Sequence, residues 1–233
     1  MLTIACVYRK SGSTYSNEWV YKLQRGIARN ITIPYNFVCL TNLSNEQLPG
    51  VTILPLTEKF PHWWSKIELF KPKQFSGRVL YFDIDSLICG NIDNIANYNS
   101  NNLIMLRDCP KFPHVTNSSL MAWDSSNSIY ENIFYDFKKN QWTIMQDYYG
   151  KLGVEHYGDQ GFINDVMKKN NHIPERWQEV LPYQWFLEFS YLDRINPLVA
   201  DGNYNKDARV SYCLGYPKFN NLPQLDLVSR HWI

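Results

Sequence analysis

The sequence lacks the long apolar segments that define membrane and secreted proteins. No run of 18 consecutive apolar residues occurs, and the apolar run before Arg9 and Lys10 is five residues long. A transmembrane helix needs about 20 apolar residues, and a secretory leader needs a longer apolar region than this one. We therefore expect a cytoplasmic protein without a transmembrane segment.

An excess of charge of one sign is also missing. The chain has 23 Lys and Arg residues against 22 Asp and Glu residues, so no global field attracts nucleic acid, and we expect no nucleic-acid partner. Its five cysteines are odd in number and far apart, which fits neither a disulfide framework nor a zinc site and suits a reducing cytosol. Neither a Gly-x-Gly-x-x-Gly motif nor a Walker loop is present, which makes a standard dinucleotide or P-loop site unexpected.

The apolar patterns that are present predict an α/β fold. The chain opens with a strand over 2–8, a helix with apolar positions between 19 and 28, and strands over 36–40 and 51–54. This βαβ order predicts a parallel sheet, and 233 residues suffice for one large domain. The later patterns predict helices over 62–70, 91–98 and 129–137 and from 158, and strands over 79–82 and 103–106. Residues 117–124 are predicted to form a polar turn that leads into an apolar strand.

Two acids follow the apolar strand over 79–82, in the order Asp83-Ile84-Asp85. In an extended backbone, side chains at i and i+2 point to the same face, so Asp83 and Asp85 are aimed together. They stand at the carboxyl end of a central strand, where open α/β sheets bind ligands. A hard divalent cation, Mg²⁺ or Mn²⁺, would relieve their repulsion and complete its shell with substrate phosphates. A strand-ending turn with two solvated acids is the alternative.

The helix expected over 62–70 carries an apolar face and one lysine, Lys66. Trp63, Ile67 and Phe70 form one apolar face, which we assign to the core. Lys66 is either a surface charge or a group that neutralises a diphosphate.

The helix that begins at residue 158 carries a polar pair in its first turn. Asp159 stands near the N-cap, and capping is its ordinary role. Gln160 has no structural reason to be there, which keeps a ligand role open. Asn117 and Ser118 supply small polar groups for loop chemistry or for a sugar-binding edge.

Four segments taken in order resemble GT-A glycosyltransferases of the bacterial or phage type, in the glycogenin and lipopolysaccharide galactosyltransferase group. They are WWSKIELF at 63–70, GRVLYFDID at 77–85, GDQGFI at 158–163 and GYPK at 215–218. The resemblance extends from Ile4 to the C-terminus. It implies one GT-A domain over 1–233, a Rossmann-like α/β/α sandwich with a mainly parallel central sheet. Residues 1 to about 115 would bind the nucleotide sugar, and residues from about 116 to 233 would bind the sugar and the acceptor.

The resemblance also implies partners and residue roles. The donor would be a nucleotide-diphospho-sugar, with a UDP-sugar favoured, and the acceptor a glycan, a polysaccharide or another hydroxyl. Asp83 would touch the ribose and a Mn²⁺ or Mg²⁺ ion, and Asp85 would bind that ion directly. The catalytic pair would be Asp159 and Gln160. The remaining donor-binding positions would be Val7, Tyr8, Lys66, Ile84, Asn117, Ser118 and Lys218.

One position departs from this family pattern. Relatives place a metal-binding histidine just before the Gly of the Gly-x-Pro-Lys turn, and this chain has Cys213-Leu214 there. Either His231 takes over, or the Asp pair, donor phosphates and water hold the metal, or metal binding and activity are lost.

Two other functions stay open. A strand followed by Asp-x-Asp also fits a haloacid-dehalogenase-type phosphatase, although a complete βαβ unit precedes Asp83, and Asp159 is followed by Asp165 at an unsuitable spacing. The missing histidine favours a catalytically weak or inactive module that binds sugar nucleotides or glycans. The acceptor side is assigned to the irregular aromatic segment over 177–204.

Overall fold

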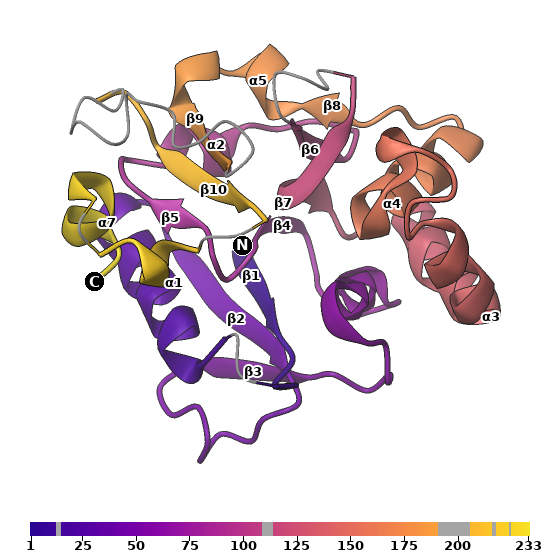
Figure 1. The fold of residues 1–233 in the computed structure, drawn as a ribbon, viewed down its shortest axis with the longest axis horizontal. Coiled ribbons are helices and arrows are strands. Elements are labelled where there is room, and N and C mark those ends of the chain that lie inside the picture. The colour runs from indigo at the N-terminus through magenta and orange to yellow at the C-terminus, as the bar shows by residue number, and fades with distance from the viewer. Residues whose placement is uncertain (13–14, 109–113, 191–205, 216–217, 224) are drawn as a thin grey trace.

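The computed structural model describes residues 1–12, 15–108, 114–190, 206–215, 218–223 and 225–233. It contains a seven-stranded sheet in the order β3-β2-β1-β4-β7-β6-β8 and a three-stranded sheet in the order β5-β10-β9 (Figure 1). The strands of the large sheet are β1 Leu2–Tyr8, β2 Tyr35–Thr41, β3 Thr52–Pro55, β4 Arg78–Phe82, β6 Ile104–Arg107, β7 Thr116–Asp124 and β8 Glu175–Arg176. The small sheet contains β5 Leu87–Ile88, β9 Phe186–Ser190 and β10 Val210–Leu214.

The predicted parallel opening of the sheet is confirmed. Strand β1 runs parallel to β2 and β4, and β2 runs parallel to β3. Strand β7 is the exception, because it runs antiparallel to both β4 and β6. The helices are α1 Asn17–Asn30, η1 His62–Phe70, α2 Asp93–Asn97, η2 Ser128–Tyr130, α3 Glu131–Asp147, η3 Val154–His156, α4 Gly158–Lys169, α5 Trp177–Val180, η4 Tyr183–Trp185, η5 Phe219–Asn221 and α7 Asp226–His231.

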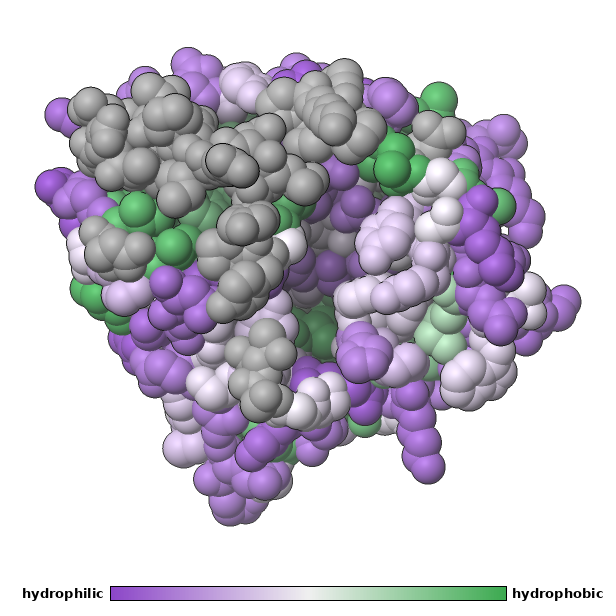
Figure 2. All heavy atoms as spheres, viewed as in Figure 1, coloured by the Kyte–Doolittle hydropathy of each residue, from purple (hydrophilic) through white to green (hydrophobic). Residues whose placement is uncertain are grey.

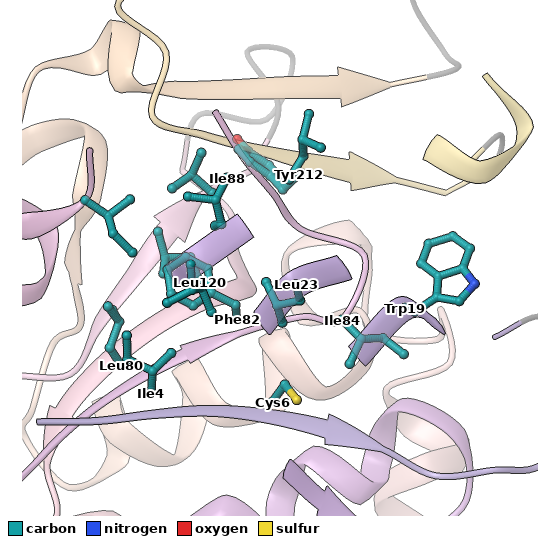
Figure 3. Packing of buried hydrophobic residues seen from close by; sticks show 14 of the residues in the cluster. Ile4, Cys6, Trp19, Leu23, Leu80, Phe82, Ile84, Ile88, Leu120 and Tyr212 are labelled. Atoms are coloured by element: carbon teal, nitrogen blue, oxygen red, sulfur yellow. The ribbon is translucent and has the colours of Figure 1, made fainter. Parts of the chain in front are cut away.

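Strand β4 divides two cores, as its uninterrupted apolar sequence predicts. Leu80 and Phe82 face the core that α1 and the small sheet cover, and Figure 3 shows both in this core together with Leu23 of α1. Val79 and Tyr81 face the other core, which contains side chains from η1, α3 and α4. Helices lie on both faces of the sheet, and this arrangement confirms the predicted α/β sandwich.

The prediction that Trp63 of η1 belongs to the core is wrong. The segment is a 3₁₀ helix, in which side chains three residues apart lie one above the other. Trp64, Ile67 and Phe70 therefore form the buried ridge, with Trp64 packed against Phe137 at a ring-centroid distance of 4.8 Å. Trp63 is left 41% exposed, against 4% for Trp64.

Helix α3 extends ten residues beyond its predicted end at residue 137. Its last buried apolar position is Phe137, and a kink at Asn140 follows (φ −136°, ψ 32°). The predicted end coincides with the last fully buried position, and beyond it only partly buried residues such as Ile144 and Met145 contact the core. Within the described ranges, no helix is long and apolar enough to cross a membrane. Of the cysteines, Cys109 lies outside the described residues and the other four are free thiols.

Candidate functional site

The Asp-x-Asp motif lies in a tight turn at the carboxyl end of β4. The strand ends at Phe82, and the backbone N–H of Ser86 donates to the carbonyl of Asp83 at 3.0 Å. The expectation that both acids share one face of an extended backbone is therefore wrong. The turn directs Asp83 toward Lys66 and Tyr81, and Asp85 toward Tyr15 and Lys218.

Lys66 joins three polar partners from different parts of the chain. Its Nζ lies 3.0 Å from Asp83 Oδ1, 3.0 Å from Asp159 Oδ2 and 2.8 Å from Ser118 Oγ. The Ser118 hydroxyl accepts from Lys66 and donates to Asp159 Oδ2 at 2.7 Å. These contacts match the three N–H donors of an ammonium group, so the buried lysine is fully satisfied.

Electrostatics keep this buried cluster ionised. Burial lowers the pKa of Lys66, but the carboxylates of Asp159 and Asp83 outweigh burial, and the pKa lies above its usual range. Burial raises the pKa of Asp83, but Lys66 and the Tyr81 hydroxyl outweigh that effect and hold it below its usual range. Burial, and then the charge of Asp83, raises the pKa of Tyr81, which remains a neutral hydrogen-bond donor. The cluster therefore contains a true ion pair.

Asp159 does not cap helix α4. The N-cap position is Tyr157, and no side chain there closes the first turn. Asp159 lies one residue inside the helix, buried, with its carboxylate on Lys66 and Ser118. A charged partner holds the carboxylate more strongly than backbone N–H groups do, which explains the failure of the capping expectation. Gln160 follows it in the same turn and is half-buried.

A second ion pair occupies the other acid. Lys218 Nζ lies 2.6 Å from Asp85 Oδ2, and the Tyr15 hydroxyl donates to the same oxygen at 3.0 Å. Burial lowers the pKa of Lys218, but Asp85 outweighs burial and raises it. Burial, and then Asp85, raises the pKa of Tyr15, which therefore stays protonated. Lys66 and Lys218, which are far apart in the sequence, thus both contact the Asp-x-Asp turn.

The other predicted donor-binding residues surround this turn at different depths. Val7 and Tyr8 end β1, which pairs with β4, and the Tyr8 hydroxyl donates to the Tyr15 carbonyl at 3.2 Å. Asn117 is buried and accepts from the Ser119 N–H at 2.8 Å, which fixes the start of β7. The Ile84 side chain is buried in the core beside α1.

The structure does not bring His231 to the acids. His231 ends α7, and its carbonyl accepts from Arg29 at 2.8 Å. Burial, followed by Arg29 and Arg230, lowers its pKa. Among the described residues, no three His, Cys, Asp or Glu side chains gather where they could hold a metal ion. Cys213, at the position of the missing histidine, has a pKa raised by burial and by Asp85, so it is a neutral thiol.

Sequence reasoning missed three neighbours of the acids. Tyr81 lies two residues before Asp83 on the same face, and strand period alone could have identified it. Tyr15 comes from the turn after β1, and no pattern in the sequence points to it. The Ser119 carbonyl accepts a hydrogen bond from the Asp83 N–H at 2.8 Å, which connects β7 to the turn. Tyr216 and Pro217 of the predicted GYPK turn lie outside the described residues, as do residues 191–204 of the segment assigned to the acceptor.

No family model matches this chain, and neither does any curated protein. Solved structures do match. The Streptococcus pneumoniae TIGR4 glycosyltransferase GlyE superposes with a TM-score of 0.66 at 13% identity, covering 99% of this chain and 58% of GlyE. The apo structure of the bifunctional glycosyltransferase WbbM gives a TM-score of 0.62 at 13% identity, over 98% of this chain and 48% of WbbM. The chain has a GT-A glycosyltransferase fold.

A third GT-A structure matches over most of both chains. The galactosyltransferase LgtC, in complex with donor and acceptor sugar analogs, gives a TM-score of 0.53 at 10% identity over 93% of this chain and 88% of LgtC. In contrast, this chain spans about half to three-fifths of the lengths of WbbM and GlyE. The likeness establishes the GT-A architecture, and the chemistry must be argued from the residues themselves.

Proposed function

We propose that this protein transfers a sugar from a nucleotide-diphospho-sugar to a hydroxyl of a glycan acceptor. The observation that carries the proposal is the convergence of Lys66 and Lys218 on the Asp83–Asp85 turn, at the carboxyl end of β4 in a GT-A fold. Ligands bind at the carboxyl ends of strands in open α/β sheets. A UDP-sugar is the favoured donor.

The charges at the turn suit a diphosphate that arrives with a divalent cation. Two lysines, Lys66 and Lys218, face three carboxylates, those of Asp83, Asp85 and Asp159, which leaves one negative charge. A bare diphosphate would be repelled by such a cluster. A divalent cation reverses the sign of the cluster and makes it attractive to phosphate oxygens.

Asp83 and Asp85 would hold this cation, Mn²⁺ or Mg²⁺. The chemistry of the two carboxylates fits a hard cation, and because the described residues gather no third metal-binding side chain, donor phosphates and water must complete the shell. Both contacts to Asp85 use Oδ2, so Oδ1 remains for a metal. When bound, the cation supplies Lewis-acid stabilisation of the departing diphosphate.

The protein's own groups would assist departure by electrostatics. Cleavage of the sugar–phosphate bond builds negative charge on the diphosphate, and Lys66 and Lys218 offer fixed positive charge next to it. Asp159 is held by Lys66 and Ser118, so its proposed role is to position Lys66 and to border the sugar together with Gln160. Asn117 and Ser118 would line the same sugar.

Thermal stabilisation by a panel of nucleotide sugars, with and without Mn²⁺, tests the proposal. A donor at one hundred times its Kd should add about 2.7 kcal/mol to the free energy of unfolding. We expect one nucleotide sugar to stabilise the protein and to be hydrolysed slowly, in both cases only with metal. Equal stabilisation with and without metal would contradict the metal assignment, and no stabilisation by any donor would contradict the transferase.

A glycan- or nucleotide-sugar-binding module without catalysis is the second candidate. The absence of His231 from the acid cluster favours it, because a metal held by two carboxylates is weakly bound. Such a module would be stabilised by a nucleotide sugar without hydrolysing it. The fold gives the phosphatase alternative no support, since the matched structures are glycosyltransferases. Four free thiols suit a reducing compartment, and the cytoplasm is the proposed location.

A further inference from the structure

Three aromatic side chains gather on the surface next to the site. Trp63, Tyr149 and Tyr157, here called the aromatic platform, are 41%, 67% and 42% exposed. The rings of Trp63 and Tyr149 lie 4° from parallel with centroids 6.3 Å apart, and Tyr157 lies 6.5 Å from Trp63 and 6.1 Å from Tyr149. Trp63 and Tyr149 are stacked, whereas the Tyr157 ring is tilted by 40° against Trp63 and by 39° against Tyr149. All three separations lie within the range of interacting aromatic rings, so the three form one contiguous surface.

The chain connects this platform directly to the buried cluster. Trp63 and Lys66 lie three residues apart in the 3₁₀ helix η1, so their side chains share one ridge. Tyr157 is followed by Gly158 and then by Asp159, the carboxylate on Lys66. Gly158 has φ +67°, and a Cβ added there would lie 3.7 Å from the Trp63 indole nitrogen. The helix η1 therefore carries both Trp63 and Lys66, and the segment 157–159 carries both Tyr157 and Asp159.

The local backbone is arranged to keep Trp63 outside the core. His62, a non-glycine residue, has φ +49° at the start of η1, a conformation that costs free energy. Trp64, its neighbour, already fills the core position against Phe137 and Phe162. Grouped exposed aromatic rings carry a hydration cost that a binding partner removes.

We propose that the aromatic platform binds a hexose ring of the acceptor glycan; this inference rests on the proposed function. A pyranose presents C–H groups on one face and hydroxyls at its rim, which suits the face of an exposed aromatic ring such as that of Trp63. The donor diphosphate belongs with the buried lysines, so the exposed rings beside them suit the second substrate. Figure 2 shows a hollow near the middle of the face that it draws, and in the same view of Figure 1 α3 and α4, the helix that directly follows Tyr157, lie to the right of the centre.

Glycan binding by the full chain tests the platform. Lactose, maltotriose and other short hexose oligosaccharides on an array would be screened first, and the best one titrated by calorimetry. We expect the Trp63→Ala variant to bind that glycan about tenfold more weakly than the parent, and the Trp63→Phe variant to retain most of the affinity. Trp142→Ala is the matched control, because Trp142 is 72% exposed on α3 and has no place in the platform. Melting temperatures of all variants check that folding is unchanged.

The outcomes separate the platform from the transferase. If a nucleotide sugar stabilises the protein while no oligosaccharide binds, or Trp63→Ala binds as tightly as Trp142→Ala, the platform inference is overturned and the transferase stands. Glycan binding that depends on Trp63 without any donor binding would support the platform and contradict the transferase. Self-association of the chain that Trp63→Ala abolishes, without glycan binding, would assign the surface to a second copy and overturn the inference.

Discussion

Lys66 and Lys218 meet the same motif, yet the two ends of the motif are built differently. Lys66 is 7% exposed and has three oxygen partners from β7, the β4 turn and α4. Lys218 is 16% exposed, and its ion pair is with one carboxylate oxygen that Tyr15 also uses. The first lysine is therefore part of the packed interior, whereas the second can be displaced by a ligand.

The difference has a cause in the chain. Lys66 is carried by η1, whose buried ridge anchors it against α3 and α4. Lys218 precedes the three-residue η5, where its backbone N–H donates to Asn221 Oδ1 at 3.2 Å. A lysine held by a single ion pair at the edge of a short helix moves at smaller cost. The following predictions test this contrast, in order of decreasing effect.

Replacing Lys66 should have the largest effect. In Lys66→Met the buried carboxylate of Asp159 and the adjacent Asp83 lose their partner, and we expect a loss of about 3–5 kcal/mol in the free energy of unfolding. Urea denaturation measures this loss, and the exposed Lys168→Met is the control. The double variant Lys66→Met, Asp159→Asn should recover part of the loss. A loss below about 1 kcal/mol would contradict a structural role for Lys66.

Replacing Asp85 should remove metal-dependent donor binding while the fold is kept. Asp85→Asn keeps the size of the side chain but removes the charge that a cation and Lys218 both require. Calorimetric titration should show that the Asp85→Asn variant binds Mn²⁺ plus a nucleotide diphosphate at least tenfold more weakly than the parent, a loss of about 1.4 kcal/mol. Unchanged affinity would sink the metal assignment at this turn.

Replacing Lys218 should have opposite effects on metal and donor. Lys218→Ala frees Asp85 Oδ2, so Mn²⁺ should bind the free protein a few-fold more tightly, whereas the nucleotide diphosphate should bind about tenfold more weakly. Stability should fall by less than in Lys66→Met, because the Tyr15 hydroxyl still donates to Asp85 Oδ2 when the lysine is gone. In the parent protein, metal and donor should raise each other's affinity by the same factor. Tighter donor binding in the variant would show that Lys218 only blocks the site.

The smallest effect concerns acid stability. Because the folded pKa of Asp83 lies below its unfolded value, its contribution is present above about pH 4 and is lost as the pH falls through the folded pKa. Melting temperatures of Asp83→Asn should therefore fall less steeply below pH 4 than those of the parent. Asp136→Asn, a surface acid paired with Lys169, serves as control. If the melting temperatures of the parent and of Asp83→Asn fell equally steeply below pH 4, the lowered pKa of Asp83 would be contradicted.

Local patterns predicted the elements, and long-range contacts decided the site. The apolar run of β4 identified a central strand and the acids that follow it. A three-residue period and a 3.6-residue period differ by one position in η1, so the sequence alone placed Trp63 inside instead of Trp64. The turn after Phe82 contains neither Gly nor Pro, so the local sequence does not predict a turn there. The partner of Asp159 is 93 residues away, beyond the reach of any spacing rule.

The antiparallel strand β7 has a consequence for synthesis of the chain. Strand β6 reaches the rest of the large sheet through β7, and β4 is an open edge until residues 116–124 have been made. Lys66 acquires Ser118 with that strand and Asp159 only with α4. A nascent chain that ends near residue 115 would expose an unpaired apolar strand next to an incompletely neutralised lysine. We therefore expect the edge of β4 to be covered once β7 has been made, and the charge of Lys66 to be fully paired only once α4 has followed.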